Sequence, residues 1–357
     1  MKTYYKFILN TYLKSFLFVF LIMLSLVVIL NILSELEFFR NTDVNFLFPI
    51  YLSLLNSPAL IFEMFPFIFL ISTQLFFISL FTDNQIQIFK YSGLKNSKIL
   101  LIISMFSFFL GLIIITLFYS FSSNLKNFYL EFKNDYTADD KYLAVVTKNG
   151  LWIKDNTNGN INIINASEIN DNFLINTFIT QFDENYEVIK NIQSKKIDIS
   201  KNEWLAYDVK VYTNNQKKEF DSLKLISNFN YQKIQSLFSN LSSLSILRLI
   251  DLRENYKSLN YSIVEVDLEL NKIISYPIYL SLMTILSAII MFNIKRFSST
   301  TFKISIGLFL SVIIYYINNF FYVMGKTEKF DILFSIWAPL TILLFLNLIM
   351  FNKINEK

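Results

Sequence analysis

The sequence has 357 residues, of which 54% are hydrophobic and 17% aromatic, while only 17% are charged. A soluble domain of this length carries more charge, and more Gly and Pro, than the 6 Gly and 5 Pro found here. The absence of Cys and His excludes disulfides, thiolate and histidine catalysis and Cys/His metal sites, and a net charge of +4 is too small to indicate a nucleic-acid partner.

Six stretches without Asp, Glu, Lys or Arg are long enough to cross a bilayer, which takes about 20 mostly apolar residues. They are Ser15–Ser34, Met64–Thr82, Ile99–Leu125, Ile273–Ile294, Ile304–Gly325 and Ile332–Asn352. The first is too long for the apolar part of a signal peptide, and Glu35-Leu36-Glu37 follows it in place of small residues. We therefore expect it to remain attached.

A seventh uncharged stretch, Val44–Phe62, contains Pro49 and Pro58 and becomes polar near Asn56. A half-length apolar segment is more often interfacial or re-entrant than spanning, so Val44–Ser57 is predicted to be such a helix. With six spans, the segments on the side of the termini carry eleven basic residues and the short loops on the other side carry three. The positive-inside rule then predicts cytoplasmic termini.

Residues 126–272 differ in composition from the spans, with 18 basic and 20 acidic residues and short apolar runs between turn signals such as Asn156–Asn160. Leu205, Tyr207, Val209 and Val211 alternate with polar or small neighbours, which predicts a half-buried strand. Several short strands at this spacing indicate a sandwich, barrel or jelly roll, outside the cytoplasm by the span count. We divide the chain into residues 1–125 (three spans), 126–230 (β domain), 231–272 (helical connector) and 273–357 (three spans).

The sequence offers few groups for catalysis. It has no GxxxxGK[ST] phosphate loop, so ATP is not bound in that way. No ionisable residue lies in the strict interior of a span, and Glu63 at the outer end of the second span comes nearest. The acidic residues Glu265, Asp267 and Glu269 are expected to be solvated. We expect no catalytic residue, no metal and no cofactor.

The loop between the second and third spans, residues 84–94, is more informative. Ile86, Phe89 and Lys90 can share one face of a short helix, and Gly93 is suited to end it. Such a helix is predicted to lie along the cytoplasmic surface with its apolar residues exposed. It is either an amphipathic loop that rests in the headgroups or a docking element for a cytoplasmic partner.

Four local sequences, in order along essentially the whole chain, resemble the LptF/LptG lipopolysaccharide export permeases. They are Ser57-Pro58 followed by Phe65-Pro66, Ile86 to Leu94 ending in Tyr91-Ser92-Gly93-Leu94, Lys272-Ile273-Ile274 before Pro277, and Gly150-Leu151-Trp152-Ile153-Lys154-Asp155. The last is similar to the GLWxKD strand of the LptG branch.

The resemblance implies an α-helical, six-span protein of the bacterial inner membrane with an inserted periplasmic β-jellyroll domain. Its function would be that of a non-catalytic permease subunit, which extracts lipopolysaccharide from the inner membrane and passes it to a periplasmic bridge for the outer membrane. The implied partners are an LptF-like permease subunit, an LptB-like cytoplasmic ATPase dimer and an LptC-like periplasmic jellyroll protein. The first and fifth spans would line the lateral entry for the lipid.

The resemblance also implies two sets of site residues. The helix that couples to the ATPase would use Gln85, Ile86, Phe89, Lys90, Tyr91, Gly93 and Leu94, and contacts to lipid phosphates would come from Asn31, Arg40, Lys126 and Lys133. Two alternatives remain open: the sibling subunit LptF, and a membrane-anchored sensor or assembly factor whose β domain binds a protein. An intramembrane enzyme is disfavoured because His, Cys and intramembrane acid pairs are absent.

Overall fold

A computed structural model describes residues 3–42, 44–134, 136, 151–157, 159–170, 172–184, 186–213, 216–231, 234, 240–258, 262–293 and 299–351. The chain forms two compact units, one of Met1–Tyr129 with Val264–Lys357 and one of Leu130–Ile263. Within the described residues, the first unit contributes six helices that are long and apolar enough to span a membrane. This confirms the span count.

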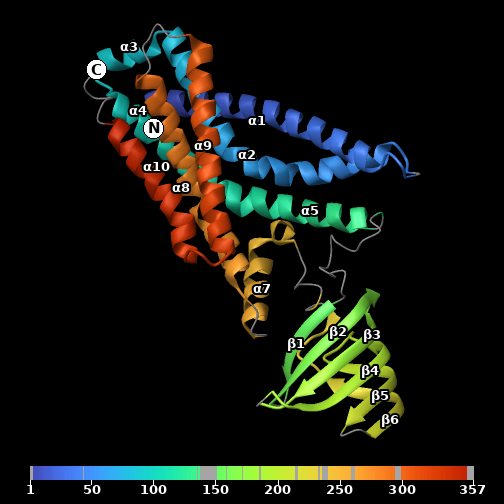
Figure 1. Ribbon diagram of the computed structural model, residues 1–357. Coiled ribbons are helices and arrows are strands. Elements are labelled where there is room, and N and C mark those ends of the chain that lie inside the picture. Colours follow the sequence, from blue (N-terminus) through green and yellow to red (C-terminus); the bar gives the residue numbers. More distant parts are fainter. Residues whose placement is uncertain are drawn as a thin grey trace. The chain divides into compact units, whose positions relative to one another are not determined.

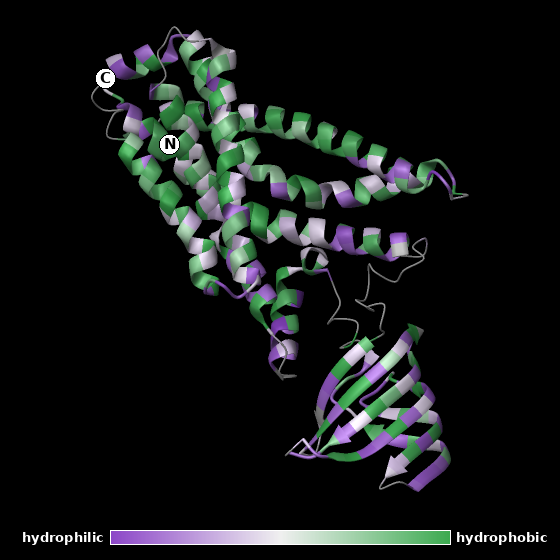
Figure 2. Ribbon diagram, viewed as in Figure 1, coloured by the Kyte–Doolittle hydropathy of each residue, from purple (hydrophilic) through white to green (hydrophobic). Residues whose placement is uncertain are grey.

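The membrane unit is built from long helices (Figure 1). They are α1 (Thr3–Phe38), α2 (Leu47–Thr82), α3 (Gln85–Tyr91), α4 (Asn96–Ile113), a π-helical turn (Ile114–Phe118), α5 (Tyr119–Asn134), α8 (Val264–Asn293), α9 (Thr300–Lys326) and α10 (Ile332–Phe351). The segment from α4 to α5 is one continuous span. Figure 2 shows that hydrophobic residues cover most of α1 and α10.

The helix α2 corrects one prediction. Val44–Ser57 is not a separate re-entrant segment, because α2 begins at Leu47 and continues through Pro58 to Thr82. Two of the residues in this stretch contact α1, where the Asn31 amide donates to the Ser53 carbonyl at 2.9 Å and accepts from the Asn56 amide at 3.3 Å. These hydrogen bonds remove the cost of placing polar groups among apolar helices.

Pro66 leaves one backbone carbonyl of α2 without a partner inside the helix. Proline has no N–H, so the carbonyl of Phe62 loses its partner within the helix. The hydroxyl of Tyr276, on α8, donates to this carbonyl instead. A side chain of a neighbouring helix thus satisfies the freed backbone group, as membrane helices with proline require. In Figure 1, α1, α2 and α5 diverge from α8, α9 and α10.

A close approach of α4 and α8 holds the two groups of helices together. A Cβ atom on Gly111 would lie 2.9 Å from the Cα of Pro277, so only glycine fits there. Close by, Ser107 on α4 is hydrogen-bonded to Tyr12 of α1 at 3.1 Å and to Thr284 of α8 at 3.0 Å. Small residues and shared hydroxyl hydrogen bonds are the usual means by which membrane helices associate.

The second unit contains an antiparallel six-stranded sheet, which confirms the inserted β domain. Its strands are β1 (Leu151–Thr157), β2 (Asn160–Asn170), β3 (Phe173–Phe182), β4 (Val188–Asp198), β5 (Glu203–Thr213) and β6 (Gln216–Ile226), paired in that order. Trp204 is fully buried on the inner face and donates to the Phe229 carbonyl at 2.8 Å. Gly159 (φ +77°) makes the predicted turn between β1 and β2.

The buried face of β5 differs from the predicted alternation of Leu205, Tyr207, Val209 and Val211. Trp204, Ala206 and Val209 are buried, whereas Leu205 and Tyr207 face the other way. The alternation changes at Asp208, which has a φ of +51° and no partner between the pairs Lys196–Tyr207 and Ser194–Val209. Lys195 of β4 is also unpaired at this point, and the register is the same on both sides, so no residue is inserted. The left-handed backbone of Asp208 turns the following side chains to the opposite face.

The described residues between the sheet and the fourth span include two short helical elements. A 3₁₀ turn at Leu241–Ser243 precedes α7 (Ile246–Ser258), which buries Leu249 and Leu252. The helix α8 already begins at Val264, before the residue Ile273 at which the fourth span was predicted to begin.

Candidate functional site

The helix α3 ends in the way that its glycine predicts. Gly93 has a φ of +76°, its N–H donates to the Lys90 carbonyl at 3.0 Å, and the N–H of Leu94 donates to the Phe89 carbonyl at 2.9 Å. These two hydrogen bonds form a Schellman motif, and it requires a left-handed residue at the position of Gly93. The motif gives α3 a fixed length and end.

The faces of α3 differ from the prediction. Ile86 and Leu94 are buried and Phe89 is half-buried in a core with Ile99, so the expected exposure of Ile86 and Phe89 is wrong. Phe7 of α1 also packs on Phe89, with ring centroids 6.0 Å apart. The exposed apolar side chains of this helix are Ile88, at 60%, and Tyr91, at 89%. The sequence could not show this, because the packing partners come from α1 and α4.

The polar residues predicted for the coupling helix lie at its edges. Gln85, at its first position, donates from Nε2 to the Asp83 carboxylate at 3.3 Å. Lys90 is exposed, as are Tyr91 and Gly93. The structure thus brings the predicted coupling residues together, but it divides them into a buried set and an exposed set.

The four residues predicted to contact lipid phosphates have separate surroundings. Asn31 is buried and hydrogen-bonded to α2, while Arg40 is exposed and forms an ion pair with Glu37 at 3.7 Å. Lys126 lies where the charges of Glu63, Glu269 and Lys272 act on it. Lys133 is buried on α5. None of these four residues lines the cavity between α2, α8, α9 and α10, although the charges of Glu63 and Lys272, which do line it, act on Lys126.

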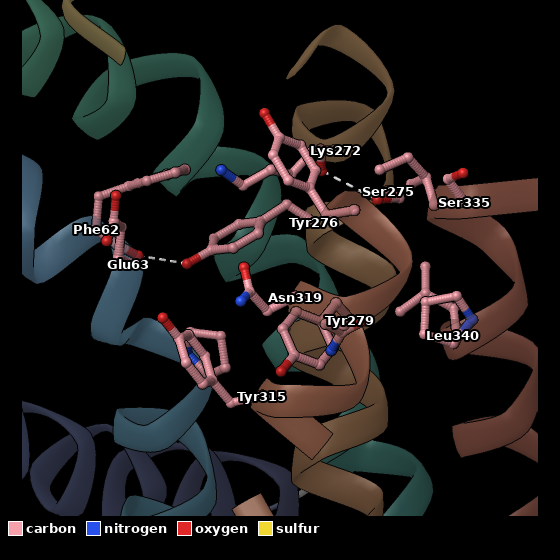
Figure 3. Close-up of a pocket in the computed structure, with 15 residues that line it drawn as sticks. Phe62, Glu63, Lys272, Ser275, Tyr276, Tyr279, Tyr315, Asn319, Ser335 and Leu340 are labelled. Carbon is pink, nitrogen blue, oxygen red and sulfur yellow. Dashed lines mark hydrogen bonds between the residues drawn. The ribbon is translucent and has the colours of Figure 1, made fainter. Parts of the chain in front are cut away.

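That cavity lies where α2, α8, α9 and α10 meet, and its volume is about 260 Å³. Figure 3 shows Glu63 on the α2 side, Ser335 and Leu340 on the opposite side, and Tyr276, Tyr279 and Tyr315 between them. Its polar lining is Glu63, Lys272, Ser275, Tyr276, Tyr279, Tyr315, Asn318, Asn319, Tyr322 and Ser335. We call it the α2–α9 pocket.

Lys272 is held in this pocket by a second acidic residue. Its ammonium lies 3.2 Å from a carboxylate oxygen of Glu269, one turn earlier on α8, and the Tyr322 hydroxyl donates to the same carboxylate at 3.4 Å. The side chain of Glu269 is only 8% exposed, so the expectation that this residue is solvated is wrong. Glu265 is half-exposed and pairs with Lys326. The i, i+3 spacing of Glu269 and Lys272 was a signal that sequence reasoning missed.

The depth of the α2–α9 pocket follows from helix length. Glu63 lies 19 residues before the end of α2 at Thr82, and Lys272 lies 21 residues before the end of α8 at Asn293. At about 1.5 Å per residue these lengths approach the roughly 30 Å thickness of the hydrocarbon core. The pocket is therefore about one membrane thickness away from the end of α2 that leads into α3.

The spans differ in how much of their surface the chain itself covers. Only 22% of the hydrophobic stretch of α1 and 17% of that of α9 are buried, against 61% for α2 and 72% for α8. Large apolar side chains are exposed along both of the first two helices, among them Phe18 on α1 and Phe309 on α9. These two helices present the surfaces that lipid or another protein must cover.

Comparison with known protein families gave a match over nearly the whole chain. A search of curated proteins gave no match. The family model described as lipopolysaccharide export system permease LptF/LptG matches residues 6–353, which include both groups of spans and the inserted sheet. The chain therefore belongs to the LptF/LptG family of lipopolysaccharide export permeases.

Proposed function

We propose that this chain is the LptG-type permease subunit of an ATP-driven complex in the bacterial inner membrane. The complex extracts lipopolysaccharide from the outer leaflet and passes it, through the periplasmic β-jellyroll domain, to a bridge that leads to the outer membrane. The proposal that ATP drives this complex rests on α3, a fixed helix with two exposed apolar side chains, Ile88 and Tyr91.

Docking of a cytoplasmic ATPase on α3 is supported by how the helix is held. The Schellman motif at Gly93 and the burial of Ile86 fix α3 to the ends of α2 and α4. A push on Ile88 or Tyr91 is then transmitted to these spans as a rigid-body movement. The chain lacks a phosphate loop of its own, and extraction of a lipid must offset the loss of about 0.8 kcal/mol for each CH₂ that leaves the bilayer.

Pairing with a second permease subunit is supported by α1 and α9. These are the two least buried spans, and a heterodimer would cover one side of each and leave an apolar, lipid-accessible cavity between the subunits. An LptF-like subunit is the proposed partner. An LptC-like jellyroll protein is the proposed periplasmic acceptor of the lipid.

A role of the β domain in lipid transfer is supported by a cavity of about 230 Å³ inside it. Ile164, Ile179 and Trp204 form part of its wall, and Asp155 and Gln181 contribute polar groups. A lining of this mixed kind suits an amphipathic molecule that has one apolar part and one polar part.

The LptG assignment is supported by β1. Leu151, Ile153 and Asp155 of the GLWIKD segment face the inner side of the sheet, while Trp152 is 58% exposed; Gly150 lies outside the described residues. Asp155 accepts hydrogen bonds from the hydroxyl of Ser227 at 2.7 Å and from the side-chain amide of Asn228 at 2.9 Å. Co-expression tests the assignment: we expect a stable heterodimer with an LptF-type subunit and none with an LptG-type subunit, and the reverse preference would make this chain the LptF subunit.

The docking proposal is tested by Ile88→Asp and Tyr91→Asp. A buried charge in an apolar contact is strongly unfavourable, so each change is expected to remove the ATPase from the purified complex without unfolding the permease. Thr82→Asp, at an exposed site beside α3, is the matched control and is expected to retain the ATPase. Full ATPase binding by both variants would contradict docking on α3, and purification without any ATPase would favour a sensor or assembly factor.

A further inference from the structure

The α2–α9 pocket lies within one subunit, apart from the surfaces of α1 and α9 that are proposed to face a second subunit. Its walls carry one carboxylate and one ammonium from different helices, Glu63 of α2 and Lys272 of α8. About one membrane thickness from the end of α2 at Thr82, these two groups lie at the level of the lipid headgroups and not in the hydrocarbon core. These two charges determine which charged groups a ligand of the pocket must carry.

Glu63 is available to a ligand. It makes no hydrogen bond or ion pair with the described residues, although Lys126 lies within range of its charge. Lys272 is positioned by Glu269, which contacts one side of its ammonium at 3.2 Å. An ammonium has three N–H donors, so Lys272 retains donors for a second anionic group.

The pocket lining itself carries one negative charge, Glu63, and one positive charge, Lys272. An anionic phosphate alone would meet the repulsion of Glu63, and a cationic amine alone would meet that of Lys272. A group that carries both charges satisfies both residues. The volume of about 260 Å³ suits such a headgroup but is too small for several acyl chains.

The neutral lining fits the same kind of ligand. Tyr315, Asn318 and Asn319 of α9 offer hydroxyl and amide donors, which suit the oxygens of a phosphodiester. The Tyr276 hydroxyl is already used by the Phe62 carbonyl, so its ring is what remains for the ligand. On the far side, the buried residues Ile336, Pro339 and Leu340 of α10 form an apolar wall.

We propose that the α2–α9 pocket binds the headgroup of a lipid that carries a primary ammonium next to a phosphate, with the ammonium at Glu63 and the phosphate at Lys272. Two lipids share this chemistry: an ethanolamine phospholipid of the bilayer, and an exported lipopolysaccharide with amine-bearing phosphate groups. The inference relies on the proposed function only for the side of the membrane that the pocket faces.

The test is lipid retention by the full chain, measured by native mass spectrometry after reconstitution in phosphatidylcholine nanodiscs with added phosphatidylethanolamine or phosphatidylglycerol. Wild type is expected to retain phosphatidylethanolamine about tenfold over phosphatidylglycerol, because a hydrogen bond between two charged groups exceeds a neutral one. Glu63→Gln, which keeps the shape of the side chain, is expected to abolish this preference. Lys272→Gln is expected to lower the retention of both phospholipids.

The matched control is Glu37→Gln, an exposed carboxylate on α1 outside the pocket, which is expected to keep the preference. Equal retention of the two phospholipids by wild type, or a preference that survives Glu63→Gln, would overturn the proposal. A second arm adds lipopolysaccharide: displacement of phosphatidylethanolamine from wild type identifies the exported lipid as a ligand, and retention identifies the bilayer phospholipid. Neither arm contains ATPase, so its result is independent of docking on α3.

Discussion

The helices α2 and α8 differ from α1 and α9 in what covers their surfaces. The chain buries most of the hydrophobic stretch of the first pair and about a fifth or less of that of the second. All four are apolar enough to span a membrane, so hydropathy alone does not account for the difference. The buried helices α2 and α8 form the scaffold of the subunit. The exposed helices α1 and α9 form the surface that the proposed partner and the lipid would contact.

The scaffold is held by polar contacts as well as by packing. The Ser287 hydroxyl of α8 donates to the Leu70 carbonyl of α2 at 2.7 Å, and Tyr276 donates to the Phe62 carbonyl. In lipid, apolar contact between helices gives little driving force, so close packing and such hydrogen bonds have more weight. The comparison predicts that changes in the scaffold affect folding, whereas changes in α1 or α9 affect assembly.

The largest effect is expected from Gly111→Leu. A leucine side chain at this position must enter the space occupied by Pro277, whose Cα lies 2.9 Å from a Cβ at position 111. Overpacking of this kind typically costs about 1–3 kcal/mol. Thermal unfolding of the purified chain in detergent measures the loss. Thr116→Leu, at an exposed site on the same span, is the control, and equal melting temperatures for the two variants would show that α4 and α8 do not pack closely.

A smaller effect is expected from Tyr12→Phe. The change removes the hydroxyl that binds Ser107 at 3.1 Å, while the ring stays in place and Ser107 keeps its hydrogen bond to Thr284. Hydrogen bonds between membrane helices contribute about 0.6 kcal/mol on average. The same unfolding measurement applies. Tyr316→Phe, at a residue of α9 that is 66% exposed, is expected to leave stability unchanged, and an equal loss there would argue against the division into scaffold and surface.

The smallest effect on stability is expected from Phe309→Ala. This side chain is 68% exposed on α9, so its removal creates no internal cavity, and the melting temperature of the chain alone is expected to stay the same. Co-purification of the second permease subunit is expected to fall, because an apolar anchor of the proposed interface is lost. Unchanged co-purification of Phe309→Ala, together with a lower melting temperature, would place α9 in the scaffold.

The sequence was sufficient for features that depend on local composition. Six apolar stretches predicted the six spans, and Gly93 predicted the end of α3, since a left-handed residue is needed there whatever surrounds it. The continuity of α2 could not be predicted in this way. Pro58 and Pro66 indicate a break, and the hydroxyl that compensates Pro66 belongs to Tyr276, more than two hundred positions further along the chain.

The α2–α9 pocket and the exposed face of α3 could not be predicted from the sequence either, because both depend on contacts between distant segments. Glu63 and Lys272 each appeared at the end of a span, but their meeting in one pocket depends on how α2 and α8 pack. The exposed face of α3 depends on Phe7 and Ile99, which cover Phe89 and Ile86 from other helices. In β5, the positive φ of Asp208 reversed the faces of the residues after it, and an alternating sequence pattern does not show such a backbone conformation.

The proposed function makes this permease dependent on a separate ATPase. Its most direct test is the release of lipopolysaccharide from proteoliposomes that contain the chain and its co-purified partners. Release to a periplasmic acceptor protein is expected only when ATP is present, and none is expected from the Ile88→Asp complex. Full transfer in the absence of the ATPase would contradict this dependence.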